Sequence, residues 1–307
     1  MDAACLPFVS VIVPVFNDAI GLKRCLDALD QQTYSRHLYE IVVVDNGSDA
    51  AQTPTEIVTG FQQTTLAFES KPGSYAARNK GISVAKGSVL AFTDADCIPA
   101  QNWIEQGVNE LLKNPQCGFV AGKIDISFQD ANNPTAIELY ESLWYALPQQ
   151  EFVEKHHFGA TANLFTFATV MYQVGVFDAT LKSNGDREWG QRVYQAGYQP
   201  RYAETARITH PARHTLSQLD SRARRIAGGR YDLQQRHSLL KRNILFIIGI
   251  LKYLVAPFLM IGFNLFLDRR LKTSHQKIQI TWIMFFVSSV YISEMMRLKA
   301  GKPSHRG

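Results

Sequence analysis

The feature that most constrains the fold is a regular alternation in the first 100 residues. Continuous apolar runs, rich in β-branched residues, are separated by segments whose apolar residues recur at helical spacing. The runs cover residues 8–15, 40–44, 65–68 and 89–93. Strands that are apolar throughout and joined by helices are typical of a mostly parallel sheet covered by helices on both faces. The predicted fold class is therefore α/β, with a Rossmann-like arrangement.

Three aspartates follow these runs. Asp45 ends the second predicted strand, and Asp94 and Asp96 come directly after the fourth. Ligands of parallel sheets bind beyond the carboxyl ends of the strands, so we expect these carboxylates to converge. Two carboxylates on one turn suit Mg²⁺ or Mn²⁺, which leaves its other positions to phosphates and water. Asp-x-Asp alone is a weak motif, because a loop aspartate is more often a turn former or a helix cap.

The combination of motifs is more specific than any one of them. VSVIVPVFN at 9–17, IVVVDNGSDA at 41–50, A-R-N at 77–79 and FTDAD at 92–96 occur in that order, followed by SNGDREWGQRV at 183–193. This series resembles the family 2 inverting glycosyltransferases of the GT-A fold, over about 200 residues. The resemblance implies transfer of a sugar from a nucleotide-sugar donor to a hydroxyl acceptor.

The resemblance also implies a donor site. Its nucleotide-binding residues would be Pro14, Asn17, Asp45, Arg78, Asn79 and Asp94. Asp96 and His210 would hold the metal, and Arg213 would contact phosphate. Other roles remain open from the residues alone: Asp45 as a turn residue, Arg78 and Asn79 as a surface helix pair, and His210 as a structural histidine.

Asp186 matches the position of the family's catalytic base, and Glu188 would lie on the acceptor side. Inversion at an anomeric carbon needs one displacement, in which a single base takes the proton of the acceptor hydroxyl. The alternative is that both acidic residues only complement the N-terminal dipole of a helix that starts at Asp186. This sequence departs from the family at Gly185, where an acidic residue often precedes the base.

The charge is divided unequally along the chain. Residues 1–220 carry 16 basic and 24 acidic residues, whereas residues 221–307 carry 16 basic and 3 acidic residues, a net charge of +13. The basic residues of the second part surround two apolar stretches, 244–267 and 278–296. This pattern favours an anionic membrane over nucleic acid as the partner.

The four cysteines are too few and too dispersed for a disulfide framework, so they favour a reducing compartment.

Both apolar stretches are long enough to cross a bilayer, which takes about 20 residues. The predicted domains are a GT-A domain at 1–220, a basic juxtamembrane linker at 221–243, and a hydrophobic helical hairpin with a basic tail at 244–307. No secretory signal is evident at the N-terminus, and the excess of basic residues at both ends of the hairpin places them, with the catalytic domain, in the cytoplasm. The alternatives are a hairpin lying in the membrane interface or two soluble core helices.

We therefore expect a membrane-associated, metal-dependent inverting transferase that acts on a glycan or glycolipid acceptor in envelope biosynthesis. Two other classes stay open at this stage. An aspartyl-nucleophile phosphatase would also place Asp-x-Asp after a strand, with Asp94 as the nucleophile. A non-catalytic membrane scaffold could be built on the same fold, because fold does not fix function.

Overall fold

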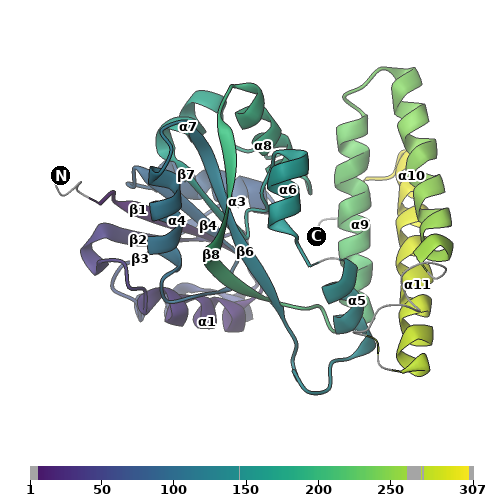
Figure 1. Cartoon of the computed structure of the whole chain (residues 1–307), viewed down its shortest axis with the longest axis horizontal. Helices are drawn as coiled ribbons and strands as arrows, with labels where there is room; N and C mark the ends of the chain where they lie inside the picture. The colour runs from purple at the N-terminus through teal and green to yellow at the C-terminus, as the bar shows by residue number, and fades with distance from the viewer. Residues whose placement is uncertain (1–5, 145, 261–270, 272, 304–307) are drawn as a thin grey trace. The chain divides into compact units, whose positions relative to one another are not determined.

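The computed structural model describes residues 6–144, 146–260, 271 and 273–303 (Figure 1). The chain divides into two compact units. The sheet unit comprises Met1–Ser127, Leu147–Thr180 and Gly185–Pro211, and the helical unit comprises Phe128–Ala146, Leu181–Asn184 and Ala212–Gly307. Cys5, the last part of the first apolar stretch (261–267) and the end of the basic tail (304–307) lie outside the described residues.

The first half of the sheet is parallel. The strands lie in the order β3-β2-β1-β4, and each is bonded in parallel to its neighbour. Their bounds are within one residue of those expected: β1 Val9–Val15, β2 Tyr39–Asp45, β3 Thr64–Phe68 and β4 Val89–Thr93. β1 and β4 are buried along nearly their whole length because helices cover both of their faces.

The second half of the sheet reverses direction. β7 (Asn163–Phe167) is antiparallel to β4, and β6 (Cys117–Ser127) is antiparallel to β7. β8 (Gln199–Pro211) runs parallel to β6, and the two-residue β5 (Ile98–Pro99) adds to it in the antiparallel direction. Four of the seven strand pairings in the described residues are parallel, so the α/β prediction is confirmed for a sheet that is mixed.

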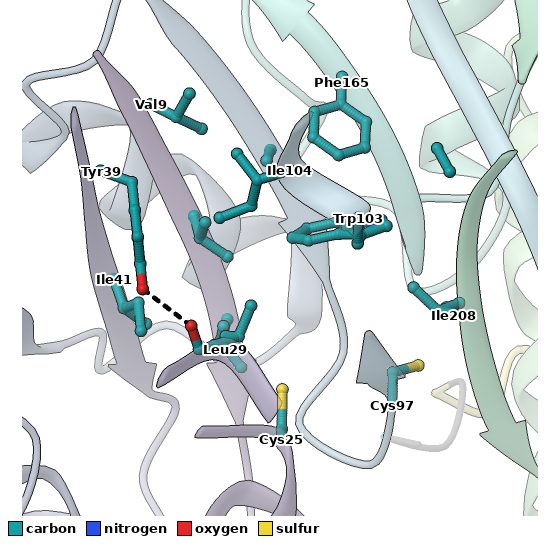
Figure 2. Close-up of a cluster of buried hydrophobic side chains, with 14 of the residues drawn as sticks. Val9, Cys25, Leu29, Tyr39, Ile41, Cys97, Trp103, Ile104, Phe165 and Ile208 are labelled. Carbon is teal, nitrogen blue, oxygen red and sulfur yellow. Dashed lines mark hydrogen bonds between the residues drawn. The ribbon is translucent and has the colours of Figure 1, made fainter. Parts of the chain in front are cut away.

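Helices pack on both faces of the sheet. One face carries α1 and α4, whose buried residues share a core with β1 and β7; Figure 2 shows Trp103 and Ile104 beside Phe165 in this core. The other face carries α3, where a Cβ on Gly81 would lie only 2.5 Å from Ile12 Cγ2. The helices of this unit are α1 Ala19–Asp30, α2 Thr55–Thr59, α3 Ser74–Val84, α4 Trp103–Leu112, α6 Gln149–His156, α7 Ala168–Val174 and α8 Gly185–Gln195.

The helical unit contains α5 (Ala136–Trp144), α9 (Leu216–Gln234), α10 (Leu239–Met260) and α11 (Ser274–Lys299). Apolar residues of α5, α9 and α11 form one core, which explains why the boundary differs from the one expected at residue 220. The expected linker at 221–243 is largely helical, because it contains most of α9 and the start of α10.

Both long helices of this unit, α10 and α11, have the length and apolar composition needed to cross a membrane. The two helices differ in the share of their apolar residues that is buried within the unit. About half of the apolar window of α11 is buried, but only 18% of that of α10. Glu294 of α11 is fully buried and forms ion pairs with Arg224 of α9 and with Arg297. α10 therefore leaves an apolar surface that no other described part of the unit covers.

Candidate active site

The candidate site lies at the carboxyl edge of the sheet. Asp45 ends β2, Asp94 follows β4, and His210 is the penultimate residue of β8, which runs in the same direction as these strands. The short strand β5 explains how the loop after β4 reaches β8. Ile98 pairs with Thr209, so residues 94–97 are held beside His210.

Asp94, Asp96, Cys97 and His210 form a cluster that could hold a metal ion, since their ligand atoms all lie within 4.8 Å of one another. His210 Nε2 is 3.8 Å from Asp96 Oδ2. The other ring nitrogen, Nδ1, is 2.8 Å from the carbonyl oxygen of Pro211. A carbonyl can only accept, so Nδ1 carries hydrogen, and Nε2 is the ring nitrogen that faces Asp96.

The chemistry of the donor atoms fits a hard divalent cation. Burial, followed by the nearby charges of Asp96 and Asp94, raises the pKa of the Cys97 thiol well above its usual range. The thiol is therefore neutral in the metal-free site, and thiolates suit softer metals than Mn²⁺ or Mg²⁺. Two carboxylates and one imidazole remain, a set that suits Mn²⁺ or Mg²⁺ better than a thiolate-preferring metal. The residues predicted as metal ligands, Asp96 and His210, are thus brought together, with Asp94 as a third donor.

Arg78 binds Asp94. It lies in α3, its side chain is only 4% exposed, and its guanidinium forms an ion pair with Asp94 Oδ1. The guanidinium carbon also lies 5.8 Å from the ring centre of Tyr75. A buried arginine next to the carboxylate cluster keeps positive charge at the edge where an anionic ligand would enter.

The loops after β1 and β2 are tied together by Asn17. Its backbone N–H donates to Ser48 Oγ at 2.9 Å, and its side-chain amide exchanges two hydrogen bonds with Asp49. Asp45 Oδ1 accepts the backbone N–H of Ser48 at 2.9 Å, which is the turn contact considered as its alternative role. Pro14, in β1, lies opposite Val44 of β2. Asn17, Asp45 and Pro14 therefore border one corner of the carboxyl edge.

Two asparagines fix α3 and the segment before it, and only one of them was predicted to bind the nucleotide. Asn79 donates to the carbonyl of Phe177 at 2.7 Å and accepts the N–H of the same residue at 3.1 Å, so its amide anchors α3. Asn46 was not predicted as a site residue. It is buried and bonds the backbone of Glu69, Lys71 and Gly73, which fixes the segment that leads into α3.

Asp186 lies in the first turn of α8, in the sheet unit. Its Oδ1 accepts the backbone N–H of Arg187 at 2.9 Å and the hydroxyl of Tyr75 at 3.2 Å. Burial raises the pKa of the Asp186 carboxyl above its ordinary value. The hydrogen bond from Arg187, the charge of Arg78 and the Tyr75 hydroxyl partly offset this shift. A carboxylate whose pKa is raised accepts a proton more readily at neutral pH.

Glu188 has a partner four residues further along its own helix. Its carboxylate forms an ion pair with Arg192 at 2.7 Å, and Arg192 in turn donates to the carbonyls of Val174, Gly175 and Val176. These contacts give Glu188 a structural role, and its acceptor-side role stays a prediction.

Arg213 belongs to the helical unit, where it pairs with Glu141 at 2.9 Å. Arg222 bonds the other oxygen of the same buried carboxylate. The predicted role of Arg213 in phosphate binding stays a prediction as well.

Comparison with solved structures identifies the fold. The mannosyltransferase PcManGT from Pyrobaculum calidifontis, solved with GDP-Man and Mn²⁺, matches with a TM-score of 0.65 and 18% identity over 97% of this chain and 89% of that one. GalNAc-T7, solved with UDP, GalNAc and Mn²⁺, matches with a TM-score of 0.54 and 18% identity over 73% of this chain and 48% of that one. The sheet unit has the GT-A fold of glycosyltransferases, as predicted.

Sequence comparison gives the family. The family model described as Glycosyl transferase family 2 matches residues 10–179. Glycosyltransferase AglE of Haloferax volcanii is 38% identical over 211 residues, which cover 68% of each chain. The pre-mycofactocin glycosyltransferase of Mycobacterium tuberculosis is 29% identical over 236 residues, 75% of this chain and 48% of that one. The chain belongs to glycosyl transferase family 2, which favours sugar transfer over a phosphatase with Asp94 as its nucleophile.

Proposed function

We propose that this glycosyltransferase moves a sugar from a nucleotide-sugar donor to a hydroxyl of a lipid-linked or polysaccharide acceptor, with inversion at the anomeric carbon, in envelope glycan biosynthesis. The observation that carries the proposal is the cluster of Asp94, Asp96 and His210, which lies in the same unit as the half-buried Asp186. The two structural neighbours named above were solved with nucleotide ligands and Mn²⁺, which supports a similar donor here.

The donor would lie along the carboxyl edge of the sheet. Asn17 and Asp45 would contact the nucleoside from the corner that they border, while Arg78 would supply positive charge near the diphosphate. Asp96 and His210, with Asp94, would hold Mg²⁺ or Mn²⁺. When bound, such an ion neutralises charge on the diphosphate leaving group.

Asp186 would act as the general base. The acceptor oxygen forms a bond to the anomeric carbon while the bond from that carbon to the diphosphate oxygen breaks, and the electron pair of the broken bond leaves with the diphosphate. The proton of the acceptor hydroxyl passes to the Asp186 carboxylate. A single displacement of this kind inverts the configuration at the anomeric carbon, and a positioned base contributes about 10² to 10⁴-fold to the rate.

We also propose that α10 and α11 attach the protein to an anionic membrane, with the catalytic unit on the cytoplasmic side. Many apolar residues of α10 are about half exposed or more, among them Ile247, Leu251 and Phe258. The net charge of +13 after residue 220 favours anionic head groups. Attachment next to lipid would favour a lipid-linked acceptor over a free glycan.

The test uses full-length protein in detergent with Mn²⁺, a panel of nucleotide sugars and a lipid extract as the source of acceptors. We expect one donor to give a glycolipid whose new anomeric linkage, read by proton NMR coupling, is opposite to that of the donor. Retention of configuration would contradict the single displacement, and absence of transfer from every donor in the panel would contradict the proposed function.

A further inference from the structure

Tyr75 contacts both the proposed base and the glycine beside it. The Tyr75 side chain is only 6% exposed and its hydroxyl donates to Asp186 Oδ1 at 3.2 Å. A Cβ added to Gly185 would lie 2.6 Å from the Tyr75 ring, closer than real Cβ atoms come to other atoms. The ring therefore lies directly against the Gly185 backbone. Position 185 has no room for a side chain because the Tyr75 ring occupies that space.

The two hydrogen bonds to Asp186 have the same acceptor. The backbone N–H of Arg187 and the hydroxyl of Tyr75 both bond Oδ1. A carboxylate held by two donors on one oxygen has a fixed plane, and its second oxygen is left to accept a proton from another molecule. The aromatic ring is fixed in turn, because it packs against Phe177 with 5.8 Å between ring centres and beneath the Arg78 guanidinium.

We propose that Tyr75 is a positioning residue for the transfer reaction: it holds Asp186 through Oδ1 so that Oδ2 faces the acceptor hydroxyl. The inference rests on the proposed role of Asp186 as the base. It goes beyond that role, because it makes Gly185 and Tyr75 a matched pair that orients the base. Arg78 connects this pair to the donor side, since its guanidinium lies over the Tyr75 ring and also pairs with Asp94.

A double-mutant cycle with Asp186 tests the proposal in the full-length enzyme. Tyr75→Phe keeps the ring and removes only the hydroxyl. We expect kcat to fall roughly tenfold while KM for the donor stays within about twofold, because the lost contact acts on the base and not on donor binding. In the Asp186→Asn background the same change should alter kcat less than about twofold, because residues that act as a unit are not additive.

Tyr39→Phe is the matched control. Tyr39 is 2% exposed and its hydroxyl donates to the Leu29 carbonyl at 3.0 Å (Figure 2). It is the first residue of β2, at the opposite end of the strand from the carboxyl edge. Tyr39→Phe also removes a single tyrosine hydroxyl, here from a neutral carbonyl acceptor, so it should lower the unfolding temperature and leave kcat unchanged.

A second variant disturbs the contact between Tyr75 and Asp186 without changing either residue. Gly185→Ala adds the Cβ that must displace the Tyr75 ring, so kcat should fall as it does in Tyr75→Phe. An unchanged kcat in Tyr75→Phe, or equal losses in the wild-type and Asp186→Asn backgrounds, would overturn the positioning role. Full activity of Asp186→Asn itself would overturn the proposed base, which is a separate and distinguishable result.

Discussion

Asp186 is the residue on which the proposed chemistry depends most. We expect Asp186→Asn to reduce transfer on the order of 10²-fold or more, because an amide cannot take the acceptor proton. The affinity for the nucleotide should stay near that of the wild type, since the predicted nucleotide contacts are made by other residues. Rates of transfer and nucleotide dissociation constants, measured on the same preparation, separate the two effects. A loss confined to nucleotide affinity would show that Asp186 is not the base.

The same carboxyl sets the expected pH dependence. Burial raises the pKa of Asp186, so the carboxylate that catalysis needs is lost as the pH falls through a value above the ordinary aspartate pKa of about 3.9. We therefore expect kcat to decline on the acid side at a higher pH than an exposed aspartate would give. The free energy of unfolding depends on pH in the opposite direction. Because the pKa of Asp186 is raised in the folded state, its contribution to stability is full below the unfolded pKa and is lost as the pH rises through the folded pKa. A profile of kcat against pH checks the first statement, and an acid limb at or below the ordinary value would contradict it.

Sequence motifs located the residues of this site better than they predicted their contacts. Asp96 and His210 are 114 positions apart and lie in one cluster, while their role as metal ligands stays a prediction. The amide of Asn79 instead bonds the backbone of Phe177, 98 residues further along the chain. A motif gives the residue type and the order along the chain, but the tertiary partner decides whether a polar side chain faces the ligand or the backbone. Tyr75 was missed for this reason, because its partner Asp186 is 111 residues away.

At the scale of single elements, the strands with continuous apolar runs were predicted well and the short edge strand was not. β4 has the expected bounds, whereas β5, which covers only Ile98–Pro99, lies in none of the apolar runs. Two residues carry no periodic signal, and they form a strand only because β8 offers them partners. The local sequence of α5 does not show that it packs with α9 and α11.

The position of α3 depends on the Asn79 amide, and this gives a prediction about stability. We expect Asn79→Ala to lower the free energy of unfolding by roughly 1–3 kcal/mol, because the N–H and carbonyl of Phe177 lose their partners. If the role of Asn79 is to anchor α3, nucleotide affinity measured well below the unfolding temperature should change little. Denaturant unfolding and nucleotide titration of the same variant check both statements. A large loss of affinity at unchanged stability would restore direct nucleotide binding by Asn79.

For the whole molecule, the proposal of membrane attachment gives an extraction test. The full-length protein should stay with the membrane in 1 M salt, because salt reduces the screening length to about 3 Å but does not withdraw apolar side chains from lipid. The triple variant Ile247→Asn, Leu251→Asn and Phe258→Asn should shift to the soluble fraction. Three exposed apolar residues of the sheet unit provide the control: Ile20→Asn, Val84→Asn and Leu112→Asn should leave the distribution unchanged.

Release of the unaltered protein by salt alone would contradict insertion of the two helices and would leave only electrostatic attachment. A shorter chain that ends before α10 is a poorer test than the triple variant. Deleting α11 would uncover the apolar faces of α5 and α9, which now form one core with it.

The central claim is that Asp94, Asp96 and His210 bind a divalent cation together with a nucleoside diphosphate. Thermal unfolding of the full-length protein in detergent, with UDP, GDP, dTDP or CDP in the presence and absence of Mn²⁺, tests it most directly, since a ligand of the native state raises the unfolding temperature. We predict that one diphosphate raises this temperature only with Mn²⁺, that Asp96→Asn abolishes the rise, and that the exposed control Asp27→Asn keeps it. An unfolding temperature that no diphosphate raises with Mn²⁺, or a rise that persists in Asp96→Asn, would contradict the account.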